Sequence, residues 1–310
     1  MACGDDGSPV DDAGGSTTDP GSTTDPGATA GSTSDPTGTD GPAETTADPD
    51  GSSGEVPEGT AGCGVALPEG TNTVELQVGA DTRQYLISVP TGYDPSTPTP
   101  LVFAWHGRGG SGSLARAYFG VEAAAAGDAI FVYPDGLPLA SMGGQTGWDL
   151  TPTGYDVAFF DAMLEQLGEG ACIDRERVFV TGHSFGGFMS NALSCFRPDE
   201  IRAMGSVAGG PPFGACDRET VAAWITHGTL DEVVPFSQGE QSRDAMIDRN
   251  GCSASETPVD PAPCVAYDGC SEGLPVVWCA HDETDLQGHM WPRFAGPAIW
   301  EFFASLPAPG

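Results

Sequence analysis

The chain has 310 residues, of which 44 are acidic and only 11 are basic, and its formal net charge is −33. This balance argues against nucleic acids and anionic lipid surfaces as partners, because proteins bind both through Lys and Arg. It is compatible with an uncharged substrate, such as a polysaccharide or a small ester.

The first 61 residues differ in composition from the rest of the chain. Residues 4–61 contain 13 acidic residues and no aromatic residue, Lys or Arg, and the pattern Thr-x-Asp-Pro recurs four times. An acidic segment rich in Pro, Gly, Ser and Thr cannot bury enough apolar surface to offset the entropy lost on ordering. The sequence therefore predicts a disordered tether over residues 1–61 and one catalytic domain over residues 62–310.

Cys3 lies before this tether, within Ala-Cys-Gly. The tripeptide resembles the mature end of a bacterial lipoprotein signal in which Met1 replaces the apolar region. We expect Cys3 to carry a lipid and the tether to connect it to the enzyme, the alternative being an idle thiol. No run is apolar enough to cross a membrane, and nine cysteines indicate an oxidising compartment. These features predict a secreted or cell-surface, lipoprotein-like monomer.

Beyond the tether, strand-like runs alternate with helical patterns. Residues 74–78 and 83–89 predict an antiparallel hairpin, and the continuous apolar run 101–105 is typical of a buried strand. Further strands are expected at 129–133, 178–180, 203–208, 222–226 and 276–279, with helices at 114–126, 156–167, 185–195, 241–250 and 298–305. This order implies an α/β fold with a doubly wound, mostly parallel sheet. In such sheets the functional site lies at the carboxyl ends of the strands.

Residues 182–186 read Gly-His-Ser-Phe-Gly and separate the β-prone run at 178–180 from a run with helical spacing. A G-x-S-x-G sequence in this context predicts a nucleophile elbow, in which a strand turns sharply into a helix and exposes the serine at the apex. Ser184 is therefore the candidate nucleophile. The alternative is an ordinary glycine turn with an idle serine.

A serine hydroxyl needs a general base, and the base needs an acid to orient it. His289 lies in the loop after the last strand and Asp231 lies just past a strand end, which gives the order Ser, Asp, His. Asp231 is preferred over Glu232 because one short turn from the strand reaches it first. His227, at the strand end itself, is assigned a structural role.

His281 is a rival for the role of general base. Its neighbours Asp282, Glu283 and Asp285 could form a metal site together with His289. No matching ligand cluster occurs elsewhere in the sequence, so we expect no metal.

The oxyanion of an ester intermediate needs preorganised N–H donors. We expect one from Phe185, at the amino terminus of its helix, and one from Arg108 or its neighbour Gly107. The same stretch, from Gly107 through Gly109 to Gly112, also matches the dinucleotide-binding fingerprint. However, no clear long helix leads from it to a strand that ends in a ribose-binding acid, so we expect no cofactor.

Several motifs together resemble the feruloyl esterases and polyhydroxybutyrate-depolymerase-like esterases of carbohydrate esterase family one. They are HGRGG, the Gly147-Trp148 loop followed by residues 156–159, GHSFGG, HGTLDEVVPF and Gly288-His289. The resemblance covers nearly all of residues 62–306. It implies an α/β-hydrolase fold and an extracellular carboxylic ester hydrolase without metal or cofactor, with Ser184, Asp231 and His289 as the catalytic triad. Cys264, Cys279 and the acidic tether depart from the family pattern.

The resemblance predicts a feruloyl esterase that releases hydroxycinnamic acids from plant cell-wall polysaccharide through an acyl-enzyme. Acetylxylan esterase and polyhydroxybutyrate depolymerase are the alternatives within the enzyme class. Trp148 and Trp291 are candidates to stack on an aromatic acyl group or a sugar ring, the alternative for each being burial in the core. A non-catalytic carbohydrate-binding module on a hydrolase fold is the alternative of another class. The complete triad argues against it, because binding does not need all three residues.

The eight cysteines of the domain allow many pairings that sequence alone does not rank, but their positions in the expected fold narrow the choice. Cys195 ends the helix after the nucleophile, and Cys216 lies in the loop after the next strand, so the two can meet. Similar placement leads us to expect the disulfides Cys63–Cys172, Cys195–Cys216, Cys252–Cys270 and Cys264–Cys279. The last two are the pairs most open to an exchange of partners.

Overall fold

The computed structural model describes residues 59–216 and 220–307. Cys3 and nearly all of the expected tether lie outside the described residues. Gly59 forms an isolated bridge with Asp174, and the Thr60 hydroxyl donates a hydrogen bond to the Ala171 carbonyl at 2.5 Å. Among the described residues, Gly59 and Thr60, which precede the expected start at residue 62, thus contact the domain. No described helix is long and apolar enough to cross a membrane.

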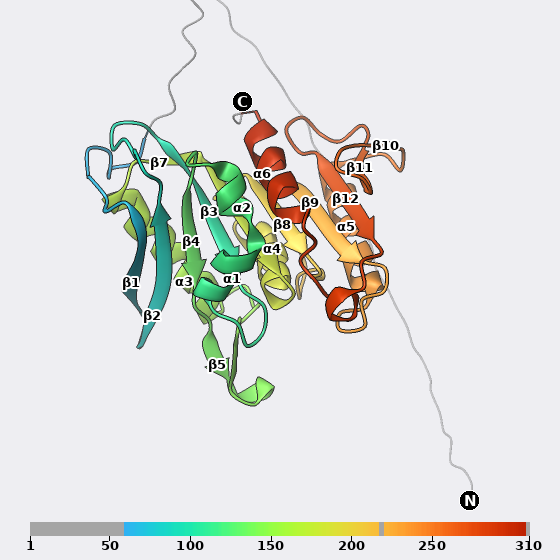
Figure 1. Ribbon diagram of the computed structural model, residues 1–310, viewed down its shortest axis with the longest axis horizontal. Helices are drawn as coiled ribbons and strands as arrows, with labels where there is room; N and C mark the ends of the chain where they lie inside the picture. The colour runs from blue at the N-terminus through green and yellow to red at the C-terminus, as the bar shows by residue number, and fades with distance from the viewer. Residues whose placement is uncertain (1–58, 217–219, 308–310) are drawn as a thin grey trace, which may run out of the picture. The chain divides into compact units, whose positions relative to one another are not determined.

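One ten-stranded sheet has the strand order β1-β2-β4-β3-β7-β8-β9-β12-β11-β10 (Figure 1). The strands from β4 to β12 in this order are parallel, and antiparallel strands flank them at both edges. The predicted mostly parallel sheet with an antiparallel hairpin at its start is confirmed. The strands are β1 (Gly70–Val78), β2 (Asp81–Val89), β3 (Thr99–Trp105), β4 (Ile130–Pro134), β7 (Ile173–His183), β8 (Ala203–Val207), β9 (Ala222–Gly228), β10 (Glu256–Pro258), β11 (Cys264–Tyr267) and β12 (Val276–His281).

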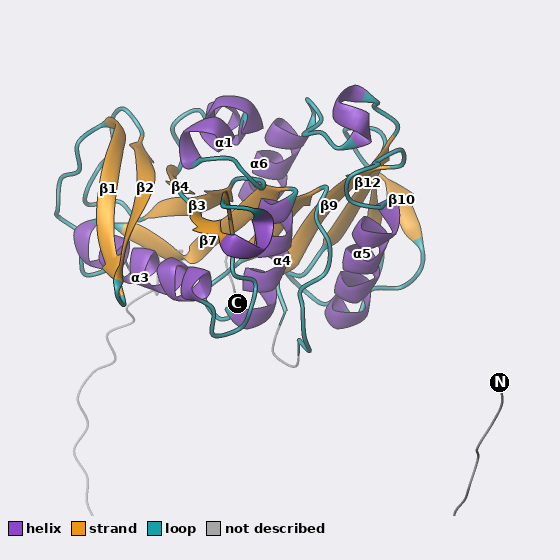
Figure 2. Cartoon of the chain, turned by 90° about the horizontal axis from the view of Figure 1, so that it is seen from below, coloured by secondary structure: helices purple, strands orange, loops and turns teal. Residues whose placement is uncertain are grey.

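Helices cover both faces of the sheet, with α3, α4 and α5 on one face and α1, α2 and α6 on the other (Figure 2). Side chains alternate between the faces along a strand. In β3, Phe103 and Trp105 pack on the first face, and Val102 and Ala104 on the second. Burial on both faces explains the continuous apolar run. The helices are α1 (Gly112–Phe119), α2 (Val121–Ala125), α3 (Tyr155–Gly170), α4 (Phe185–Phe196), α5 (Phe236–Asn250) and α6 (Ala295–Ser305).

The structure differs from the expected elements in two respects. The helix expected over 114–126 is two helices, because Gly120 adopts a left-handed backbone (φ 69°) between α1 and α2. Four short strands were not expected: β10 and β11 at the far edge of the sheet, and β5 (Leu137–Leu139) paired with β6 (Gln145–Gly147). Strands of three or four residues hold too few positions for an alternating pattern to be recognised.

Four disulfides connect distant parts of this fold. They join Cys63 to Cys172, Cys195 to Cys216, Cys252 to Cys270 and Cys264 to Cys279, the four pairs expected from the sequence. The first attaches the start of the domain to the segment before β7. The last joins β11 to β12, where the two cysteines are directly opposite partners in the antiparallel register.

A buried ion pair joins β2 to the first turn of α3. The Arg83 guanidinium donates a hydrogen bond to Asp156 Oδ1 at 2.5 Å, and the two side chains are 1% and 0% exposed. The Asp149 N–H donates to Asp156 Oδ2 at 2.6 Å. Burial raises the pKa of Asp156, whereas the charge of Arg83 lowers it. The pair thus fixes the loop before α3 to the sheet.

Arg83→Met is expected to lower the free energy of unfolding by about 3–5 kcal/mol, because it leaves the Asp156 carboxylate buried without a counter-charge. Arg175→Met is the matched control, since the pair between Arg175 and Glu200 is 39% and 35% exposed and should contribute less than about 1 kcal/mol. Denaturant unfolding at neutral pH measures both losses. Equally small losses in the two variants would contradict the prediction.

Candidate active site

Ser184 forms the turn between β7 and α4. It is not a glycine, yet its backbone has φ 55° and ψ −119°, which is a strained conformation that surrounding structure must enforce. Its N–H donates a hydrogen bond to the Val207 carbonyl at 2.9 Å. A Cβ at Gly186 would overlap the Trp105 carbonyl, and a Cβ at Gly182 would overlap the Gly186 carbonyl. The glycines on either side therefore let the strand and the helix approach closely enough to hold the serine at the apex.

Three loops at the carboxyl edge of the sheet bring together the predicted nucleophile, base and acid. His289 Nε2 lies 2.7 Å from Ser184 Oγ, and His289 Nδ1 lies 2.7 Å from Asp231 Oδ2. The loops follow β7, β9 and β12, which end at the same edge because these strands are parallel. This geometry lets the serine hydroxyl donate to the imidazole and the opposite ring nitrogen donate to the carboxylate.

The Asp231 carboxylate is held in place by backbone donors as well as by His289. The N–H groups of Val233 and Val234 each donate to Asp231 Oδ1 at 2.8 Å. Asp231 is buried, whereas its neighbour Glu232 is exposed. The preference for Asp231 over Glu232 thus agrees with the geometry of the loop, which folds back on the first of the two carboxylates.

Two backbone N–H groups near Ser184, those of Phe185 and Arg108, donate to no backbone acceptor among the described residues. Phe185 begins α4, and the first N–H groups of a helix have no partner within it. A Cβ at Gly107 would lie 3.3 Å from Ser184 Cβ, so the loop after β3 runs against the nucleophile. In the part of the chain that the structure describes, the N–H of the next residue, Arg108, donates to no protein acceptor.

The unexpected hairpin of β5 and β6 supports this loop. The Thr146 carbonyl accepts a hydrogen bond from the Gly109 N–H at 2.8 Å, and the Thr146 hydroxyl donates to the Gly110 carbonyl at 2.7 Å. The hairpin therefore fixes the segment that carries the Arg108 N–H. Strands of three residues are too short to be recognised in the sequence, so the hairpin was not predicted. Its Thr146 side chain nevertheless makes a specific hydrogen bond to the Gly110 carbonyl.

Several curated proteins match this chain along most of its length, among them two feruloyl esterases. Feruloyl esterase D of Neurospora crassa is 34% identical over 271 residues, which cover 80% of this chain and 90% of that protein. Feruloyl esterase C of Emericella nidulans is 37% identical over 267 residues, which cover 78% of this chain and 90% of that protein. The chain belongs to the feruloyl esterase family. No protein-family model matches it.

Solved structures show that this member of the feruloyl esterase family has the α/β-hydrolase fold. An acetyl xylan esterase from Aspergillus awamori matches with a TM-score of 0.59 at 14% identity, covering 75% of this chain and 99% of its own. A CE1 ferulic acid esterase from Anaeromyces mucronatus, solved with ferulic acid, matches with a TM-score of 0.51 at 17% identity, covering 83% and 93%. At such identities the likeness concerns the fold alone.

His281, the rival base, makes no hydrogen bond to Ser184 Oγ. It is buried at the end of β12, and neither ring nitrogen has a hydrogen-bond partner among the described residues. Burial lowers its pKa. Within residues 59–216 and 220–307, no group of three or more His, Cys, Asp or Glu side chains could hold a metal ion. Among the described residues, no contact of His281 thus supports a role as general base or as metal ligand.

His183 is a residue of the site that sequence reasoning missed. Its ring stacks on His289 with centroids 5.1 Å apart, and its Nδ1 lies 2.9 Å from the Tyr118 hydroxyl. Burial lowers the pKa of His183 to about 3, so it stays neutral behind the base. Its position directly before Ser184 was the only available signal.

The two tryptophans predicted to stack on substrate are buried and pack against other side chains of the protein. Trp148 is 2% exposed, packs edge-on against Trp105 at 4.9 Å and donates its indole N–H to the His106 carbonyl at 2.8 Å. Trp291 is 8% exposed and stacks on Phe119 at 3.9 Å. Neither ring presents a free face, so the structure does not support the expected stacking role.

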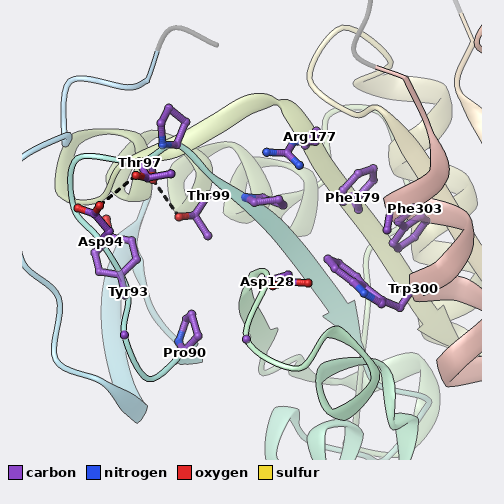
Figure 3. A pocket seen from close by; sticks show the side chains of 15 residues that line it. Pro90, Tyr93, Asp94, Thr97, Thr99, Asp128, Arg177, Phe179, Trp300 and Phe303 are labelled. Atoms are coloured by element: carbon purple, nitrogen blue, oxygen red, sulfur yellow. Dashed lines mark hydrogen bonds between the residues drawn. The ribbon is translucent and has the colours of Figure 1, made fainter. Parts of the chain in front are cut away.

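A cavity of about 420 Å³ lies at the opposite edge of the sheet (Figure 3). It is bounded by the loop before β3, by Asp128 before β4 and by Trp300 on α6. Phe179 and Phe303, stacked 4.5 Å apart, also line it. Because these elements meet at the amino ends of β3 and β4, the cavity is separate from the catalytic residues, which all follow strand carboxyl ends.

Proposed function

We propose that this protein is a serine carboxylesterase in which Ser184 is the nucleophile, His289 the general base and Asp231 the orienting acid. The observation that carries the proposal is the continuous set of contacts from the serine hydroxyl to the carboxylate. Both contacts are 2.7 Å long, and the serine sits in a strained elbow. This combination supplies a nucleophile at the apex of a turn, a base within reach and a fixed tautomer of that base.

The proposed reaction proceeds through an acyl-enzyme. His289 Nε2 takes the proton of Ser184 Oγ as the oxygen attacks the ester carbon, and the N–H groups of Phe185 and Arg108 bind the oxyanion. When the intermediate collapses, the imidazolium gives its proton to the leaving alcohol. Water then attacks the acyl-enzyme with the same base, and the acid is released as the serine regains its proton.

The proposed substrate is a hydroxycinnamoyl ester of plant cell-wall polysaccharide. The names of the relatives support this choice, and so does the surface around the triad. Eight large apolar side chains are exposed among the described residues. Four of them lie on the loops after β8, β9 and β12, namely Phe213, Leu230, Val233 and Leu286. Exposed apolar side chains on loops next to the triad are available to contact an apolar part of the substrate. An aromatic acyl group is large enough to contact them, whereas an acetyl group is not.

Leu286 is the best placed of these side chains to test acyl specificity. It is 74% exposed, and its carbonyl accepts a hydrogen bond from the N–H of His289 at 3.1 Å. The neighbouring Gln287 carbonyl accepts from the Glu232 N–H at 3.0 Å, which joins the loops of the base and the acid. Leu286 and Leu230 therefore lie on adjoining loops beside the triad.

Leu286→Ser is expected to lower kcat/KM for methyl ferulate by about three- to tenfold, because part of a leucine contact area is lost. It should leave kcat/KM for p-nitrophenyl acetate unchanged. Val65→Ser is the control, since Val65 is also exposed but lies before β1. Equal effects on both esters, or none, would contradict a hydroxycinnamoyl site here. A wild-type preference for acetylated over feruloylated xylan would favour an acetylxylan esterase instead.

We infer further that the enzyme acts outside the cell as a monomer, with a lipid on Cys3 as its anchor. The four disulfides support an oxidising compartment, because such bonds persist in secreted and surface proteins. Cys3 and residues 4–58 lie outside the described residues, so the anchor rests on the sequence pattern. Metabolic labelling with a fatty acid, compared between the wild type and Cys3→Ser, tests it.

A further inference from the structure

His227 occupies a buried position directly beside the catalytic carboxylate. It is the second-last residue of β9, and its side chain is 0% exposed. Its Nε2 lies 2.9 Å from the Val234 carbonyl oxygen and 3.2 Å from Asp231 Oδ2. A residue that the sequence assigns to a structural role at the strand end thus contacts a member of the triad.

The surroundings of His227 identify its protonation state. Burial lowers its pKa, so the ring is neutral. Nδ1 is buried and has no hydrogen-bond partner among the described residues, whereas Nε2 faces two acceptors. The single proton therefore sits on Nε2, where it is shared between the Val234 carbonyl and the Asp231 carboxylate. The contact with Asp231 is a hydrogen bond from a neutral ring and not an ion pair.

Helix α5 has a glycine, Gly239, where it passes the His227 ring. A Cβ at Gly239 in α5 would lie 2.5 Å from His227 Nδ1 and 2.6 Å from its Cγ. Glycine within a helix is destabilising. It is needed here because the His227 ring occupies the space that a larger side chain would require. The Phe236 ring packs edge-on against the imidazole with centroids 6.1 Å apart. The ring is therefore held in one orientation.

We propose that His227 is a positioning residue of the catalytic site, an inference that rests on the proposed function. Its Nε2–H is the fourth donor to the Asp231 carboxylate. The N–H groups of Val233 and Val234 bind Oδ1, while His289 and His227 share Oδ2. With every oxygen occupied, the carboxylate cannot rotate away from His289.

The test compares His227→Gln with His227→Asn, using p-nitrophenyl acetate. The longer Gln amide can place an N–H near the position of Nε2, whereas the Asn amide is too short. Asn is expected to lower kcat by about 10- to 100-fold, since a hydrogen bond to a charged group is lost, with little change in KM. Gln should restore most of kcat.

His281→Gln is the matched control, because it alters a buried histidine at the end of the adjacent strand whose ring nitrogens have no hydrogen-bond partner among the described residues. It should change kcat by less than about threefold. Equal losses of kcat in the Gln and Asn variants of His227 would overturn the positioning role, as would full activity in both. Ser184→Ala, run in the same assay, separates the two claims: residual activity there would refute the proposed function itself.

Discussion

Ser184→Ala is expected to abolish ester hydrolysis, with kcat/KM lower by about 10³-fold or more. The substitution removes only a hydroxyl that is half-buried at the apex of the elbow. The oxyanion donors and the base remain, but no oxygen is left to form the acyl-enzyme. Alanine must adopt the same positive φ as the serine, so we expect a small loss of stability and no change of fold.

The measurement is the steady-state rate on p-nitrophenyl acetate, together with the far-ultraviolet circular dichroism spectrum and the melting temperature. Near-normal activity in a correctly folded Ser184→Ala protein would refute the nucleophile. A protein that does not fold would not decide the question, so Ser184→Cys serves as the second variant. It retains a nucleophilic atom in the elbow and should form an acyl-enzyme that turns over slowly.

Loss of the base or of its orienting acid should be nearly as severe. His289→Ala leaves the serine proton without an acceptor at 2.7 Å, and Asp231→Asn places an amide where Nδ1–H needs a carboxylate. Each is expected to lower kcat by about 10³- to 10⁴-fold. His281→Ala is the control and should reduce kcat only slightly. A severe loss in His281→Ala with a mild one in His289→Ala would reassign the base.

The sequence was sufficient to predict the parallel part of the sheet and its first hairpin, and to select the three residues that the structure brings together. Each of the three follows a strand end, and parallel strands place those ends at one edge. The parallel topology alone therefore predicts that these three residues, which are far apart in the sequence, lie close together in the fold. The elbow was equally predictable, because only glycines allow the close backbone contacts around Ser184 that the structure contains.

Features that depend on side-chain packing were not predictable in the same way. Whether Trp148 faces solvent or the core depends on Trp105 and on the His106 carbonyl, neither of which a local pattern connects to it. The ion pair between Arg83 and Asp156 joins residues 73 positions apart. The role of His227 depends on an interatomic distance to Asp231, which its position at a strand end does not reveal.

Covalent labelling tests the central claim most directly. Diisopropyl fluorophosphate reacts with a serine that a neighbouring base activates, and peptide mapping by mass spectrometry locates the modified residue. The account predicts a single phosphoryl group on the peptide that contains Ser184, appearing in proportion to the loss of esterase activity and absent in His289→Ala. Complete inhibition with the label on another residue, or full activity in protein labelled at Ser184, would contradict it.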